Sequence, residues 1–110
     1  MLYFDFEAGN KQYKLRLNTR NTVALEKALG CNPVSIFGAG DTIPTITTMA
    51  TILWASLQQY HHGITLNDAY DIFDSYLEEH AATDFIPVIL EIYKVSGIIT
   101  RSAGEEAEKN

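Results

Sequence analysis

The sequence predicts a mainly helical α+β domain, in which an N-terminal β-hairpin packs on a small bundle of about four helices. Apolar and polar residues alternate over residues 2–17 around a Gly-Asn pair, as in a hairpin. Farther along, apolar residues recur at helical spacing in separate segments, which are bounded by residues that begin or end helices. We expect one domain over residues 1–99 and a disordered polar tail over residues 100–110.

The turn of the hairpin is placed at Gly9-Asn10, a pair that favours a tight two-residue connection. This turn fixes the register of the strands. The predicted cross-strand pairs are Phe6 with Tyr13, Phe4 with Leu15, Leu2 with Leu17 and, on the other face, Asp5 with Lys14. A lone hairpin is only marginally stable in water, so we expect its apolar face to lie on the helices.

Four helices are expected over residues 20–29, 43–61, 66–80 and 84–96. Asn18 or Thr19 caps the first of them, and Gly30 ends it. Thr65 and Asp68 have the T-x-x-D spacing of a capping box, which predicts the start of the third helix.

The second helix belongs to a segment, Thr42 to Tyr60, that carries no charged side chain. Thr42 is the expected N-cap. An apolar stripe at helical spacing consists of Ile46, Met49, Ala50, Leu53, Leu57 and Tyr60. Thr, Ser and Gln occupy the outer face, where a surface helix normally carries Lys or Glu. Two interpretations stay open: a central helix enclosed by the others, or a helix whose outer face is covered by another protein chain.

The fourth helix also has an apolar arc that is too wide for a surface helix. Glu91 and Lys94 form its only polar strip within residues 85–95. A domain this small can easily surround only one helix, yet the apolar residues of two helices call for it, so surplus apolar surface is expected. The residues predicted to bind partners are Ile52, Trp54, Ile86, Val88, Ile92 and Val95.

Charge is distributed unevenly along the chain, whose net charge is −6. Residues 1–30 hold five of the eight basic residues, and residues 31–93 hold none. The acidic body repels phosphate backbones, so we expect no nucleic-acid partner. No apolar run is long enough to span a membrane, and we do not expect a membrane to be a partner. Cys31 is single, which excludes an internal disulfide and fits a reducing cytoplasm.

Residues that could carry out catalysis are present but are not arranged for it. His61 and His62 are adjacent and His80 lies on another helix, without the spacing of a metal site. Cys31 follows the end of a helix, where the helix dipole disfavours a thiolate. The carboxylates of the third helix fit a solvated face. We therefore expect no catalytic, cofactor or metal site, and no enzyme activity.

A family resemblance goes further than these exclusions. Residues 25–33 have the pattern L-E-K-x-L-G-x-N-P directly after the hairpin and its following segment, and similar runs lie at Tyr70–Leu77 and Phe85–Ile99. Over residues 2–99, the order of elements resembles the tail assembly chaperones of long-tailed phages, or prophages, of Gram-positive bacteria.

The resemblance implies a small, mostly helical, non-catalytic protein of the host bacterial cytoplasm that is absent from the mature virion. Such a protein binds the tape measure protein, keeps it soluble, helps to recruit tail tube subunits and forms a homo-oligomer. It also implies a longer form made by translational frameshifting, and Glu108-Lys109-Asn110 can be encoded by a slippery run. The alternative hypothesis is a small structural tail component that remains in the virion.

Overall fold

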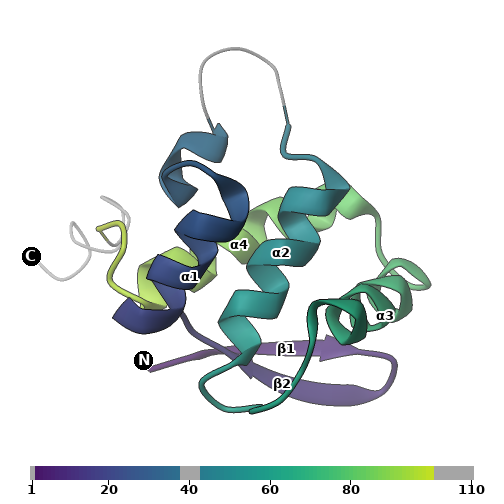
Figure 1. Ribbon diagram of the computed structural model, residues 1–110. Helices are drawn as coiled ribbons and strands as arrows, with labels where there is room; N and C mark the ends of the chain where they lie inside the picture. The colour runs from purple at the N-terminus through teal and green to yellow at the C-terminus, as the bar shows by residue number, and fades with distance from the viewer. Residues whose placement is uncertain (1, 38–42, 101–110) are drawn as a thin grey trace, which may run out of the picture.

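The computed structural model describes residues 2–37 and 43–100 and confirms the predicted fold class. A two-stranded antiparallel hairpin carries the helices on one side, with α2 between α1 and α3 and with α4 behind it (Figure 1). The elements are β1 (Phe4–Ala8), β2 (Lys11–Leu15), α1 (Thr19–Leu29), the 3-10 helix η1 (Pro33–Phe37), α2 (Ile46–Leu57), α3 (Leu66–Leu77), the 3-10 helix η2 (Ala82–Asp84) and α4 (Phe85–Val95). The predicted tail lies outside the described residues, except for residue 100.

The register of the hairpin is the predicted one. Gly9 and Asn10 have φ angles of 58° and 64°, the left-handed values that a tight two-residue turn of this kind requires. The register pairs Phe4 with Leu15, Asp5 with Lys14 and Phe6 with Tyr13. Phe6 and Leu15 are buried, so the apolar face does lie on the helices.

The expected pairing of Leu2 with Leu17 is wrong. β1 begins only at Phe4, and Leu2 is 67% exposed while Leu17 is buried. The pairing stops after Leu15 because the N–H of Leu17, which would face Leu2 in a longer hairpin, donates to Ser96 Oγ at 2.8 Å. The N–H of Arg16 points to the outer edge of β2 and donates to the carbonyl of Ser56 at 2.9 Å.

The caps of α1 and α3 follow the sequence signals. Asn18 rather than Thr19 caps α1, and its Oδ1 accepts from the N–H of Asn21 at 2.8 Å. Gly30 ends α1 with φ 72°. At α3, the Thr65 hydroxyl and the Asp68 carboxylate each accept the other residue's backbone N–H at 3.0 Å, which confirms the capping box. α3 ends at Leu77, three residues earlier than expected.

α2 is shorter than expected and is enclosed. It begins at Ile46 with Thr45 as N-cap, and the predicted cap, Thr42, lies outside the described residues. Most residues of α2 are buried, and the helix contacts α1, α3, α4 and β2. Its buried hydroxyls are satisfied within the helix: Thr51 donates to the carbonyl of Thr47 at 2.7 Å, and Ser56 donates to that of Leu53 at 2.9 Å. The interpretation of a central, enclosed helix is therefore confirmed.

α4 begins at Phe85, one residue later than predicted. Asp84 ends η2, and its carboxylate accepts the backbone N–H of Ala81 at 3.0 Å and makes no cap to α4. Pro87 lies in the first turn of α4, where its missing N–H removes no helical hydrogen bond, and Gly97, with φ 76°, follows the helix end.

An aromatic cluster joins the hairpin to α3 and α4. The ring of Phe6 lies 5.1 Å from that of Tyr76 and 5.7 Å from that of Phe85, measured between centroids. Phe73 meets Phe85 edge to face at 5.2 Å. Edge-to-face pairs of this kind stabilise a core by about 0.5–1.5 kcal/mol beyond their burial. This cluster therefore holds the hairpin against two helices that lie far from it in the sequence.

Replacement of Gly9 by Ala tests the close approach of the hairpin turn to α3. A Cβ at Gly9 would lie 3.0 Å from Ser75 Cβ, and Gly9 has φ +58°. We expect Gly9→Ala to lower the free energy of unfolding by about 2 kcal/mol or more, because left-handed strain of about 1 kcal/mol adds to the steric contact. Denaturant unfolding monitored by circular dichroism measures this loss.

Gly30→Ala is the matched control for this experiment. Gly30 also has a left-handed φ, of +72°, but nothing lies within 4 Å of an added Cβ. We expect this variant to show the backbone strain alone. Equal losses of stability in the two variants would show that the turn does not press on Ser75.

Candidate protein-binding surface

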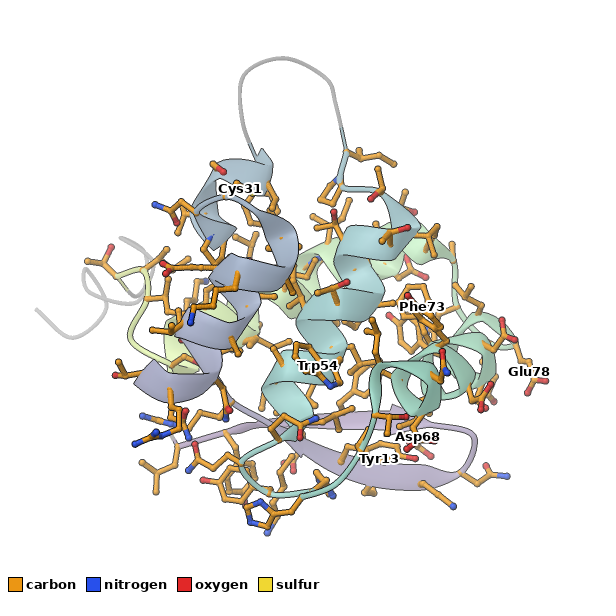
Figure 2. All side chains as sticks on the ribbon, in the orientation of Figure 1. Tyr13, Cys31, Trp54, Asp68, Phe73 and Glu78 are labelled. Carbon is orange, nitrogen blue, oxygen red and sulfur yellow. The ribbon has the colours of Figure 1, made fainter. Side chains whose placement is uncertain are left out.

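The potential metal ligands and nucleophiles lie apart from one another. Among the described residues, no group of three or more His, Cys, Asp or Glu side chains could hold a metal ion. His80 stacks on Tyr76 of α3 with ring centroids 4.4 Å apart, whereas His61 lies on the hairpin. Cys31 is exposed (labelled in Figure 2).

His61 has a structural role between α2 and the hairpin. Its Nε2 accepts the backbone N–H of Lys14 at 2.9 Å, and its ring meets Tyr13 edge to face at 5.4 Å. Only neutral imidazole can accept this hydrogen bond. Burial, with a smaller contribution from the Lys14 ammonium, lowers the pKa of His61 below its usual value of 6.5. The neutral imidazole is thus the form that the fold favours.

Lys14 contributes a second contact at the same place. Its ammonium lies 4.9 Å from the ring centroid of Tyr3 and 5.9 Å from that of Tyr60. The two rings also meet edge to face at 5.5 Å. Cation–π contacts of this partly exposed kind contribute about 0.5–1 kcal/mol. They help to fix the end of the α2 segment to the outer face of the hairpin.

The residues predicted to bind partners divide into two groups. Ile52 and Ile92 are 0% exposed and belong to the core, so the expectation that they lie on outer faces is wrong. α2 is packed on more sides than its apolar stripe indicated, because it is surrounded by α1, α3, α4 and β2. Trp54, Ile86, Val88 and Val95 are half-buried and remain partly accessible.

Trp54 lies beside a hollow between α1 and α2 (labelled in Figure 2). The hollow has a volume of about 480 Å³. It is lined by Asn18, Arg20, Asn21, Ala24, Trp54, Ala55, Gln58, Gln59 and His62. The Gln58 carboxamide donates to the carbonyls of Trp54 at 3.0 Å and Ile64 at 2.8 Å, so it closes the end of α2. The hollow therefore combines the Trp54 ring with amide side chains and with the charged Arg20.

A more apolar surface lies elsewhere and was missed by the sequence analysis. Three of the exposed aliphatic side chains belong to it: Val34 at 39%, Ile43 at 53% and Ile46 at 50%. Val34 is in η1, and the other two lie just before and at the start of α2. Figure 1 shows η1 and the start of α2 at the same end of the molecule, away from the hairpin. We call these three residues the aliphatic end.

The position of Ile46 corrects the expected core stripe. Ile46 is the first residue of α2, so it lies beyond the segment that the other helices enclose. The signal that could have located this surface is the absence of charge. Residues 31–37 and 43–60 contain no Lys, Arg, Asp or Glu. An uncharged stretch predicts burial, and the sequence alone does not show which of its ends the fold leaves uncovered.

η1 is held in place at the aliphatic end by a buried hydrogen bond. The Tyr93 hydroxyl of α4 donates to the carbonyl of Pro33 at 2.9 Å, and the Phe37 ring meets that of Tyr93 at 6.2 Å. Burial, with a smaller effect of the Cys31 thiol, raises the pKa of Tyr93 above its usual value. The hydroxyl therefore remains a donor across the physiological range, and Val34 is presented by a fixed element.

Comparison of the chain with protein-family models, with curated proteins and with solved structures returned no match. Within residues 2–37 and 43–100, no helix has the length and apolar character needed to cross a membrane.

The hydrogen bond of His61 predicts a pH dependence of stability. The unfolded state binds a proton near pH 6.5 and the folded state only at lower pH, so this stabilisation is present above pH 6.5. It is lost as the pH falls from that value through the lowered pKa of folded His61. We expect His61→Gln, whose amide oxygen can accept from Lys14 without titrating, to flatten the pH dependence between about pH 7 and pH 5.

Denaturant unfolding at a series of pH values measures this difference. His62→Gln is the control, because His62 is the exposed neighbour of His61 in the same connection. This variant should have the same dependence of stability on pH as the wild type. Parallel pH profiles for the wild type and His61→Gln would contradict the assignment of a neutral acceptor at His61.

Proposed function

We propose that this protein is a non-catalytic assembly chaperone of phage tails, which binds the tape measure protein in the host cytoplasm and keeps it soluble. The observation that carries the proposal is the aliphatic end. Three exposed aliphatic side chains lie in a part of the molecule whose described residues, 31–37 and 43–60, carry no Lys, Arg, Asp or Glu. The sequence resemblance supplies the identity of the partner.

The chemistry of the aliphatic end suits a long apolar helix. A partner that packs there removes aliphatic surface from water without stripping water from a formal charge. Burying the exposed half of an isoleucine side chain is worth about 1 kcal/mol. The aliphatic end is therefore a weak contact by itself, and a chain of copies along a long partner would add many such contacts. Many weak contacts of this kind would let copies of the protein coat a tape measure helix and later dissociate from it.

Two parts of the proposal go beyond the aliphatic end. Self-association would use the half-buried residues of α4, chiefly Ile86, Val88 and Val95. Ile86 and Val88 pack on the edge of the core, and all three remain partly exposed. Recruitment of tail tube subunits would use the longer, frameshifted form that the resemblance implies. Both follow from the resemblance. The accessible apolar residues of α4 support the self-association.

Charge placed at the aliphatic end should abolish chaperone activity while the fold survives. We expect Ile46→Lys to lose the ability to keep the tape measure protein of the same genome soluble on co-expression. The reason is that a partner would have to desolvate the ammonium, at a cost that lowers affinity by about tenfold or more. The soluble fraction of tape measure protein after centrifugation is the measurement.

Leu2→Lys is the matched control for this experiment. Leu2 is even more exposed, at 67%, but lies at the hairpin, opposite the aliphatic end. We expect it to behave like the wild type. Equal loss in both variants, or no effect of the wild-type chain on tape measure solubility, would refute the proposal.

The alternative, a small structural tail component, predicts a different protein composition of the finished particle. A chaperone leaves the tail before it is complete, whereas a structural component stays. Mass spectrometry of purified virions therefore distinguishes the two hypotheses. Peptides of this chain at a stoichiometric level in the particle would favour the structural component.

A further inference from the structure

The two outer edges of the hairpin are in different states. With the turn at Gly9-Asn10, Asp5 and Lys14 form a pair whose backbone N–H and C=O groups point away from the partner strand. On β2, α2 and the segment after it occupy this edge. The N–H of Lys14 donates to His61 Nε2 at 2.9 Å, and the N–H of Arg16 donates to the carbonyl of Ser56 at 2.9 Å.

The outer edge of β1 has no such cover. Asp5 and Glu7 are the outward-pointing residues of this strand, and both side chains are exposed. Within the described ranges, no hydrogen bond from outside the hairpin reaches the backbone of either residue. An open edge of this kind is a template for pairing with another strand. β1 therefore offers backbone donors and acceptors that the fold leaves unused.

The charges around this edge favour a basic partner. Asp5 and Glu7 project from the outer face of β1, and β1 contacts β2, α3 and α4. α3 carries no Lys or Arg, and the Lys94 ammonium of α4 lies 3.3 Å from the Glu91 carboxylate. Lys14, which faces Asp5, lies over the rings of Tyr3 and Tyr60. The Arg16 guanidinium lies at the start of β1, where it donates to the carbonyls of Leu2 and Val95. The open edge at Asp5 and Glu7 is thus acidic, next to a helix that is itself acidic.

We propose that the β1 edge binds an extended segment of a protein partner in which basic residues alternate with apolar ones. Strand addition supplies affinity through backbone hydrogen bonds, and side chains at alternate positions supply specificity. On the outer face, Lys or Arg of the added strand would lie beside Asp5 and Glu7. On the inner face, apolar residues would lie beside Phe4, which is half-buried.

A second copy of this chain fits the edge less well. Pairing of β1 with another β1 would align the carboxylates of Asp5 and Glu7 with their own equivalents, which is unfavourable. β2, the basic strand, cannot serve because its outer edge is already occupied at Lys14 and Arg16. The partner is therefore a different segment. This site lies at the hairpin, opposite the aliphatic end. Binding at the β1 edge can therefore be tested independently of the proposed function.

A labelled peptide tests the site directly. The probe is fluorescein-labelled Lys-Val-Lys-Val-Lys-Val-Lys, with a Glu-Val-Glu-Val-Glu-Val-Glu peptide as the charge-reversed control. We expect fluorescence anisotropy to show binding of the basic peptide to the full chain, and none of the acidic one. Binding should weaken as salt rises, because exposed charges are screened.

Two proline variants separate strand addition from a general charge effect. Glu7→Pro removes an outward N–H from the open edge without removing a hydrogen bond between the strands, and it should weaken binding by about tenfold. Gln12→Pro is the matched control, because Gln12 is the cross-strand partner of Glu7 and its N–H points outward from β2. It should leave the affinity within about twofold of the wild type.

A third variant keeps the test valid if the proline variants unfold. Asp5→Asn combined with Glu7→Gln retains every backbone group and should still weaken binding of the basic peptide. Circular dichroism establishes that each variant is folded. The proposal is overturned if the folded wild type does not bind the basic peptide, if it binds the acidic peptide equally, or if Gln12→Pro loses as much affinity as Glu7→Pro.

Discussion

The burial of α2 on nearly every side is the constraint on which the rest of the fold depends. A helix can be enclosed in this way only if it carries no charge and its polar side chains satisfy themselves. Thr51 and Ser56 do so by donating to carbonyls of their own helix at 2.7 Å and 2.9 Å. α1, α3, α4 and β2 can then all pack on α2, and each of them needs only one apolar face.

The two ends of α2 explain the two surfaces of the molecule. At its C-terminal end, the carbonyl of Ser56 is a helix-terminal acceptor, and it meets the unpaired N–H of Arg16 on the hairpin edge. One unsatisfied group thus satisfies another, which closes the β2 edge and leaves the β1 edge open. At its N-terminal end, α2 extends past its neighbours, so Ile46 is exposed near η1. Enclosure of the middle of the helix and exposure of its start are parts of one arrangement.

Local signals in the sequence were sufficient for the hairpin and for the helix caps. The Gly9-Asn10 turn fixes the strand register, and the Thr65 and Asp68 capping box fixes the start of α3, because both depend on residues close together in the chain. Leu2 was placed wrongly because the N–H of Leu17 donates to a distant residue, Ser96, instead of to the N-terminal strand. No local pattern reports such contacts.

The partner surface was harder to predict for a related reason. The amount of apolar surface on α2 and α4 was apparent from the sequence, but the direction from which neighbours cover it was not. Ile52 and Ile92 were predicted to bind partners because α2 and α4 have more apolar residues than one buried face needs, yet the surrounding elements bury both of them. Conversely, Ile46 fitted the stripe and is exposed because the enclosed region begins after it. Exposure depends on where the packed neighbours end, which is a property of the tertiary structure.

Native-state hydrogen exchange of α2 tests the enclosure of this helix most directly. The amides around Leu53 should exchange only when the whole domain unfolds, so their opening free energy should equal the free energy of unfolding measured with denaturant. Amides on the exposed side of α3 should open at lower cost. If α2 opened more readily than α3 or α4, α2 could not be the element on which the others depend, and this account of the fold would be contradicted.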